Sequence, residues 1–75
     1  MKELLALIAK GLVDNPDAVV VNEVPGERTT VLELKVAPED MGKVIGRQGK
    51  IAKAIRAVVK AAAIHNNVHV TVEIV

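Results

Sequence analysis

The spacing of apolar residues predicts an amphipathic helix near the start of the sequence. Apolar side chains recur every three or four positions over residues 2–13, and the charged residues of this segment lie off that face. The cluster Asp-Asn-Pro-Asp at residues 14–17 breaks the pattern and ends the helix. The expected buried face consists of Leu4, Leu5, Ile8, Leu12 and Val13.

Two strands joined by a turn are predicted next. Residues 18–24 are rich in β-branched side chains, although no inward face stands out, and residues 30–36 alternate between apolar and polar side chains. Pro25 and Gly26 are typical of a turn, so the two segments form a hairpin. One face of the second strand presents Leu32, Leu34 and Val36, and the other presents Val31, Glu33 and Lys35.

Two helices and a final strand complete the pattern. Residues 38–40, Pro-Glu-Asp, suit a helix start, because proline is favoured at the first position and acids in the first turn. Gly46 ends that helix early, a longer helix covers residues 50–64, and residues 68–74 alternate as a half-buried strand. The expected buried stripe of the longer helix is Ile51, Ile55, Val58, Val59 and Ala62.

These elements give the order α-β-β-α-α-β over a single domain of residues 1–75. The first two strands are antiparallel. The two-helix connection before the last strand is long enough to make that strand parallel to the second one. We therefore expect an α+β fold, with a three-stranded mixed sheet and all three helices on one face.

The composition removes several classes of function. The chain has no Phe, Tyr or Trp, so its core must be built from Val, Ile, Leu and Ala, and recognition by stacking bases on aromatic rings is excluded. It has no Cys, which excludes disulfides and thiolate metal sites. No long apolar run or leader-like segment is present, so we expect a cytoplasmic protein without a membrane span.

Charge is distributed unevenly along the chain, although the net charge is only +1. Residues 1–40 carry four basic and eight acidic side chains, a balance of −4, whereas residues 41–75 carry six basic and one acidic, a balance of +5. Such a concentration can create a local anion site on a nearly neutral protein. The six basic residues are Lys43, Arg47, Lys50, Lys53, Arg56 and Lys60.

The glycine motif at residues 46–49, Gly-Arg-Gln-Gly, lies between the two predicted helices. Glycine lets the backbone approach a phosphate closely, and the free N–H groups at the start of a helix attract anions. Lys50 stands in the first turn of that helix, where its charge opposes the helix dipole. A structural explanation stays open, in which Gly46 caps one helix and Gly49 relaxes the turn before the next.

The sequence is also compatible with two other functions, and it has no residues typical of a catalytic site. Two helices around a glycine turn also suit a helix-turn-helix DNA-binding protein, but the first helix is short and strands flank the pair. The small residues at positions 61–63 could instead dock a protein partner. The chain has neither Ser nor Cys, and His65 and His69 have no acidic cluster beside them, so we expect no enzyme, metal site or cofactor.

The sequence Val44-Ile45-Gly46-Arg47-Gln48-Gly49-Lys50-Ile51 resembles the V-I-G-x-x-G-x-x-I pattern of KH domains. It departs from the pattern at the closing aliphatic residue, because Ile51 directly follows Lys50 and position 52 is Ala. The element order is that of the type II, bacterial form of this fold. The resemblance covers essentially the whole chain and is closest to the small single-KH RNA-binding proteins of bacteria, the KhpA (YlqC) family.

This resemblance implies that the glycine loop binds the backbone of about four nucleotides of single-stranded RNA. Arg47 and Lys50 would add charge, Ile45 and Ile51 would form an apolar floor under the bases, and the edge of the last strand around residues 70–72 would border the groove. Arg56 and Lys60 would lie on a solvated helix face. The residues expected to bind RNA are Ile45, Gly46, Arg47, Gln48, Gly49, Lys50, Ile51 and Lys53.

The resemblance also implies partners and a cellular role. Proteins of this family form homodimers and pair with a larger KH-containing protein, KhpB. They are linked to RNA chaperoning and to the control of cell shape through elongation and division. A module that holds only a few phosphates gains affinity when it is joined to a second module, which agrees with such pairing.

Overall fold

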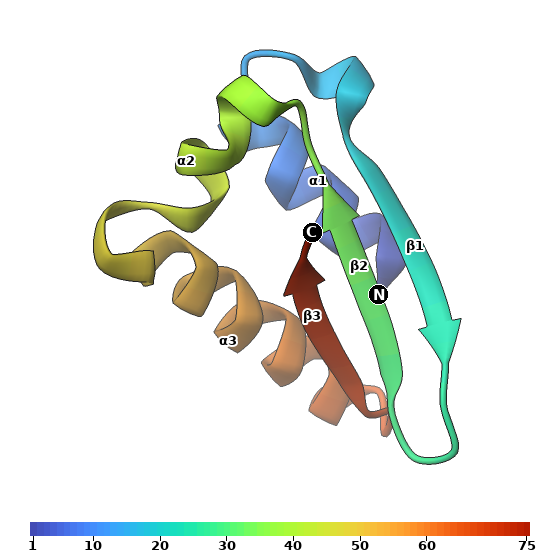
Figure 1. Cartoon of the computed structure of the whole chain (residues 1–75). Helices are drawn as coiled ribbons and strands as arrows, with labels where there is room; N and C mark the ends of the chain where they lie inside the picture. The colour runs from blue at the N-terminus through green and yellow to red at the C-terminus, as the bar shows by residue number, and fades with distance from the viewer.

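The computed structural model describes all 75 residues and has the predicted order of elements, so the α+β assignment is confirmed (Figure 1). Short 3-10 turns lie at η1 (Pro16–Ala18), η2 (Pro38–Asp40) and η3 (Arg47–Gly49). The helices and strands are α1 (Lys2–Leu12), β1 (Val20–Pro25), β2 (Thr30–Lys35), α2 (Met41–Ile45), α3 (Lys50–His65) and β3 (Val70–Ile74).

The sheet has the order β1-β2-β3, with β1 and β2 antiparallel and β2 and β3 parallel, as predicted. Leu32 in the central strand pairs with Glu23 on one side and with Val72 on the other. β3 is therefore an edge strand, and its free edge lies on the side of the molecule that holds α3 (Figure 1).

The helices lie on one side of the sheet and enclose a core without aromatic rings (Figure 1). The predicted inward face of β2 is confirmed, since Leu32, Leu34 and Val36 are all buried. α2 lies beyond the end of β3, between α1 and α3, and contributes Val44 to the core. The largest fully buried apolar side chains are Leu5, Leu32, Leu34, Val44 and Val59.

The predicted buried faces of the helices were wrong at two positions. Leu12 and Val58 are 36% and 51% exposed, whereas Ala9, Ala52 and Ala63 are buried. Leu12 and Val58 instead line an open groove between α1 and α3, so part of each side chain stays in contact with solvent.

Three element boundaries also differ from the sequence prediction. η1 takes up the start of the segment expected to be the first strand, so β1 begins at Val20. Pro38 starts a 3-10 turn before α2, which has only five residues. β3 begins at Val70 instead of Val68, because Asn67 has a left-handed φ of 58° and the Val68 N–H donates to the Ala63 carbonyl at 2.9 Å.

None of the helices combines the length and apolar character needed to cross a membrane.

Candidate nucleic-acid interface

The glycine loop is a tight turn that joins α2 to α3. The Gly46 N–H donates to the Gly42 carbonyl at 2.9 Å and closes α2, and the Gly49 N–H donates to the Gly46 carbonyl at 3.1 Å. Gly46 and Gly49 both have φ of 75°, and Gln48 has φ of 58°. The side chains of Arg47 and Gln48 are exposed at the tip of the turn. Three left-handed residues within four positions thus reverse the chain between the helices.

The two glycines are required for different reasons. A Cβ at Gly46 would lie 2.5 Å from Ile51 Cγ1 and 2.9 Å from Ile51 Cβ, so the packing of α3 against the loop leaves no room for a side chain. A Cβ at Gly49 would meet nothing within 4 Å, so only its φ restricts the residue. The fold by itself therefore accounts for glycine at position 46, as the helix-cap explanation requires, whereas Gly49 faces open space.

Lys43 is paired with carboxylates, so its charge is not available to bind a ligand near the loop. Its Nζ lies 3.1 Å from a carboxylate oxygen of Asp14 and 3.4 Å from Oδ1 of Asp40. The hydrogen bond from Lys43 to Asp14 and the charge of that carboxylate raise the pKa of Lys43 above its ordinary value. Lys43 is therefore committed to a structural ion pair, and the sequence-based count of six local cations has to be lowered to five.

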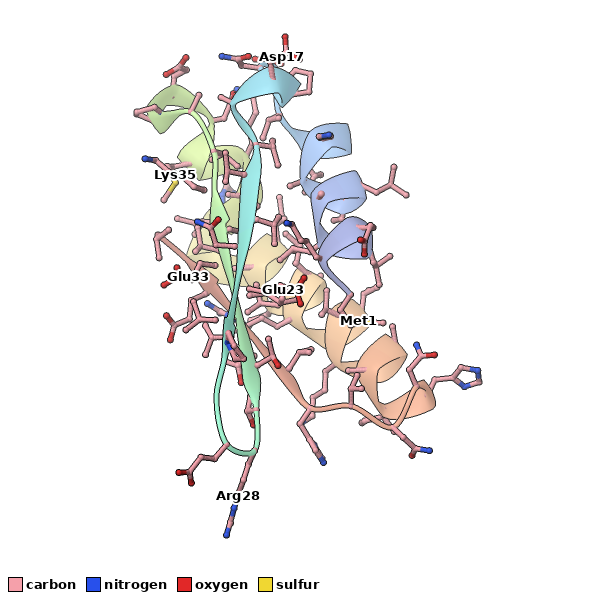
Figure 2. All side chains as sticks on the ribbon, turned by 90° about the vertical axis from the view of Figure 1, so that its right-hand side faces the viewer. Met1, Asp17, Glu23, Arg28, Glu33 and Lys35 are labelled. Atoms are coloured by element: carbon pink, nitrogen blue, oxygen red, sulfur yellow. The ribbon has the colours of Figure 1, made fainter.

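The other cations of this half of the chain are unpaired. The only side-chain ion pairs between residues involve Lys43, and the N-terminal amine contacts Glu3. Figure 2 shows Asp17 beside the connection between α1 and β1, and Glu33 on the side of the β1–β2 hairpin opposite α1. No acidic side chain forms an ion pair with a cation of the loop or of α3, so these charges can attract an anion. The unpaired cations are Arg47, Lys50, Lys53, Arg56 and Lys60.

A groove of about 250 Å³ runs between α3 and the free edge of β3. In the parallel pair, the His69 carbonyl and the Val75 N–H bond to β2, so the backbone groups of Val70 and Val72 face outward toward the groove. The edge of β3 thus borders a groove, as expected, and binding of RNA in this groove stays a prediction. The lining residues are Arg56, Val59, Lys60, Val70, Thr71 and Val72.

Arg56 is exposed on α3, as expected, and it also contacts the edge of β3. Its Nε donates to the outward carbonyl of Val72 at 3.3 Å, across the groove. Lys60, one helical turn later, lines the same groove. The sequence carried a usable sign of this arrangement, because Arg56 and Lys60 flank the buried Val59 and must therefore lie close to whatever Val59 packs against.

The structure does not place the two predicted floor residues in that groove. Ile51 lies under Gly46 and lines a second, apolar groove of about 380 Å³ between α1 and α3. Ile45 is 37% exposed at the end of α2 and lines neither groove. Lys50 borders the apolar groove, and Lys53 is exposed on α3. Sequence reasoning missed the apolar groove altogether. Its other lining residues are Ile8, Leu12, Ala54, Ile55 and Val58.

Comparison with known proteins gives a consistent picture. Residues 2–74 match the family model described as the KH domain of KhpA/KhpB. The RNA-binding protein KhpA of Clostridium perfringens is 69% identical over 75 residues, and that of Clostridium acetobutylicum is 68% identical, each over the full length of both chains. The RNA-binding protein KhpA of Chlamydia pneumoniae is 50% identical over 74 residues, which cover 99% of this chain and 95% of the relative. No solved structure matches the chain significantly.

Proposed function

The chain belongs to the KhpA/KhpB family of KH-domain proteins, and on this premise we propose that it binds single-stranded RNA through its glycine loop and the groove beside α3. The observation that carries the proposal is the set of five unpaired cations that follow the loop and α3 next to that groove. RNA is a polyanion, so these cations attract it wherever they are not neutralised by carboxylates.

The loop is proposed to bind the sugar-phosphate backbone. Gly49 has open space where a Cβ would stand, so a phosphate can come close to the main chain there. The N-terminus of the 16-residue helix α3 begins directly after Gly49, and its dipole favours a negative charge at that point. Arg47, Lys50 and Lys53 supply further positive charge from the tip of the loop and the first turns of α3.

The bases are proposed to enter the groove between α3 and β3. Half-buried Val70 offers apolar surface, and the outward backbone groups of β3 offer a donor and an acceptor to base edges. No aromatic ring is needed for this kind of contact, and KH domains bind about four nucleotides in this manner. Ile51 is assigned a supporting role under Gly46, and Ile45 an apolar contact beside the loop.

A comparison of two charge-matched variants tests the proposal. Arg47→Asp/Gln48→Asp changes the loop, and Arg28→Asp/Asn22→Asp makes the same change in net charge at exposed positions of the β1–β2 hairpin. Binding of a fluorescent single-stranded RNA should be abolished in the loop variant and only slightly weakened in the hairpin variant, with both folded by circular dichroism. If both variants bound RNA equally, the loop would not be the binding site, and a preference of the wild type for duplex DNA would refute the proposal.

We also propose that the chain pairs with a second KH domain, either its own copy or a KhpB-type protein. The family model covers both KhpA and KhpB. The groove between α1 and α3 is lined mainly by apolar side chains, among them Leu12 and Val58, which are 36% and 51% exposed. A second module would offset the modest affinity of one four-nucleotide site through effective concentration.

We further propose that the protein acts in the cytoplasm as an RNA chaperone and influences cell shape. Strand-annealing assays test the chaperone activity.

A further inference from the structure

Asp40 is the only buried polar or charged residue of the chain, with an exposed fraction of 0%. Its Oδ2 accepts the backbone N–H of Asn15 at 3.1 Å, and its Oδ1 accepts the backbone N–H of Asp14 at 3.3 Å. Lys43 Nζ donates to the same Oδ1 at 3.4 Å and also pairs with the Asp14 side chain. The carboxylate therefore joins the start of α2 to the α1–β1 connection, 25 residues away in the sequence.

The burial of the Asp40 carboxylate is not explained by capping of α2. Asp40 occupies the N-cap position of α2, yet its side chain makes no capping hydrogen bond to that helix. Burial of a charged carboxylate is costly unless its oxygens are satisfied, and here both oxygens are used by partners outside the helix. Burial raises the pKa of Asp40, but the amides of Asn15 and Asp14 and the Lys43 ammonium outweigh this effect and leave the pKa below its ordinary value. Asp40 is thus ionised at neutral pH.

The position of α2 decides the position of the glycine loop. α2 has five residues, about 7.5 Å of helix, which is too short to be stable by itself. It is fixed to the rest of the molecule by the buried side chain of Val44 and, at its first turn, by Asp40. Gly46 follows directly at its other end. A displacement at Asp40 would therefore carry α2 and the loop with it.

We propose that Asp40 is a positioning residue of the RNA site: by holding the start of α2 on the amides of Asp14 and Asn15, it sets where Gly46 to Gly49 stand relative to α3 and β3. The inference rests on the proposed RNA-binding function. Asp40 itself does not touch RNA, since it is fully buried at the end of α2 opposite the loop.

The test compares Asp40→Asn with Glu39→Gln, which removes the same charge from the neighbouring, exposed position. Plain electrostatics predicts that loss of an acid tightens RNA binding in both variants. The positioning role predicts that Asp40→Asn, unlike Glu39→Gln, weakens RNA binding. Its Kd should be about threefold to thirtyfold higher than that of the wild type, which is the effect expected of a residue coupled to a site that it does not touch. In heteronuclear NMR spectra, the amide signals of Gly46, Gln48 and Gly49 should move in Asp40→Asn and stay in place in Glu39→Gln.

The outcomes separate this inference from the proposed function. If folded Asp40→Asn binds RNA as tightly as Glu39→Gln, with unmoved loop amides, the positioning role is overturned. If the wild type does not bind single-stranded RNA, the proposed function fails, while the loop amide signals still report whether Asp40 positions the loop. If Asp40→Asn is partly unfolded, the comparison is made in trimethylamine N-oxide, which favours the compact state.

Discussion

The two glycines of the loop, equivalent in the sequence motif, should respond very differently to alanine. Gly46→Ala should strongly destabilise the fold, whereas Gly49→Ala should leave the protein folded and impair RNA binding. The prediction follows from the surroundings of each residue, because a Cβ at Gly46 meets Ile51 and a Cβ at Gly49 meets nothing within 4 Å.

The size of each effect can be worked from the backbone and the packing. Gly46 has φ of 75° and ψ of 174°, a region that other residues avoid, and forcing alanine into it costs about 1–3 kcal/mol. The contact at 2.5 Å with Ile51 Cγ1 adds an overpacking penalty of about 1–3 kcal/mol. Gly49 is left-handed without a clash, so alanine there costs about 1–2 kcal/mol. A chain of 75 residues has a total stability of roughly 4–11 kcal/mol, so only the first change threatens folding.

Urea unfolding followed by circular dichroism measures the loss of unfolding free energy in both variants. Thermal unfolding gives a second measure, because each kcal/mol lost should lower the Tm by about 4–8 °C for a domain of this size. RNA titrations are then made well below the unfolding midpoint of each variant. In Gly49→Ala, the weakening of RNA binding should exceed anything explained by its unfolded fraction, because the new methyl group stands where a phosphate is proposed to approach. Equal stability losses in the two variants, or a larger loss in Gly49→Ala, would refute the reasoning.

Three further predictions concern charge, assembly and pH. Arg47→Ala should reduce the slope of log K against log salt for single-stranded RNA by about 0.7, whereas Arg28→Ala on the hairpin should leave the slope unchanged. Val58→Lys should shift the chain toward a monomer in analytical ultracentrifugation, and an unchanged mass would remove the α1–α3 surface as the pairing site. Because the folded pKa of Asp40 lies below 3.8, its stabilising effect is present above that pH and is lost as pH falls further, so the unfolding free energies of wild type and Asp40→Asn should converge only in strong acid. If the difference in unfolding free energy disappeared near neutral pH, the lowered pKa of Asp40 would be contradicted.

Local sequence patterns determined the element order and most of the sheet. The alternation over Leu32, Leu34 and Val36 has a period of two, which only a strand can place on one buried face, and these residues are buried. The two-helix connection before β3 is long enough for parallel pairing with β2, and the structure contains this pairing. The glycine motif could be located between two helices from sequence, because helix-ending and helix-starting residues act within a few positions of themselves.

Long-range packing decided what the local pattern could not. Val58 and Leu12 have the hydrophobicity of core residues, but they line the open groove between α1 and α3 instead of the core. Lys43 counts as a loop cation in the sequence, yet Asp14 and Asp40 hold it in an ion pair. Arg56 reaches a carbonyl 16 residues further along the chain. Each outcome depends on contacts between segments that are distant in sequence, and these exist only once the tertiary fold brings those segments together.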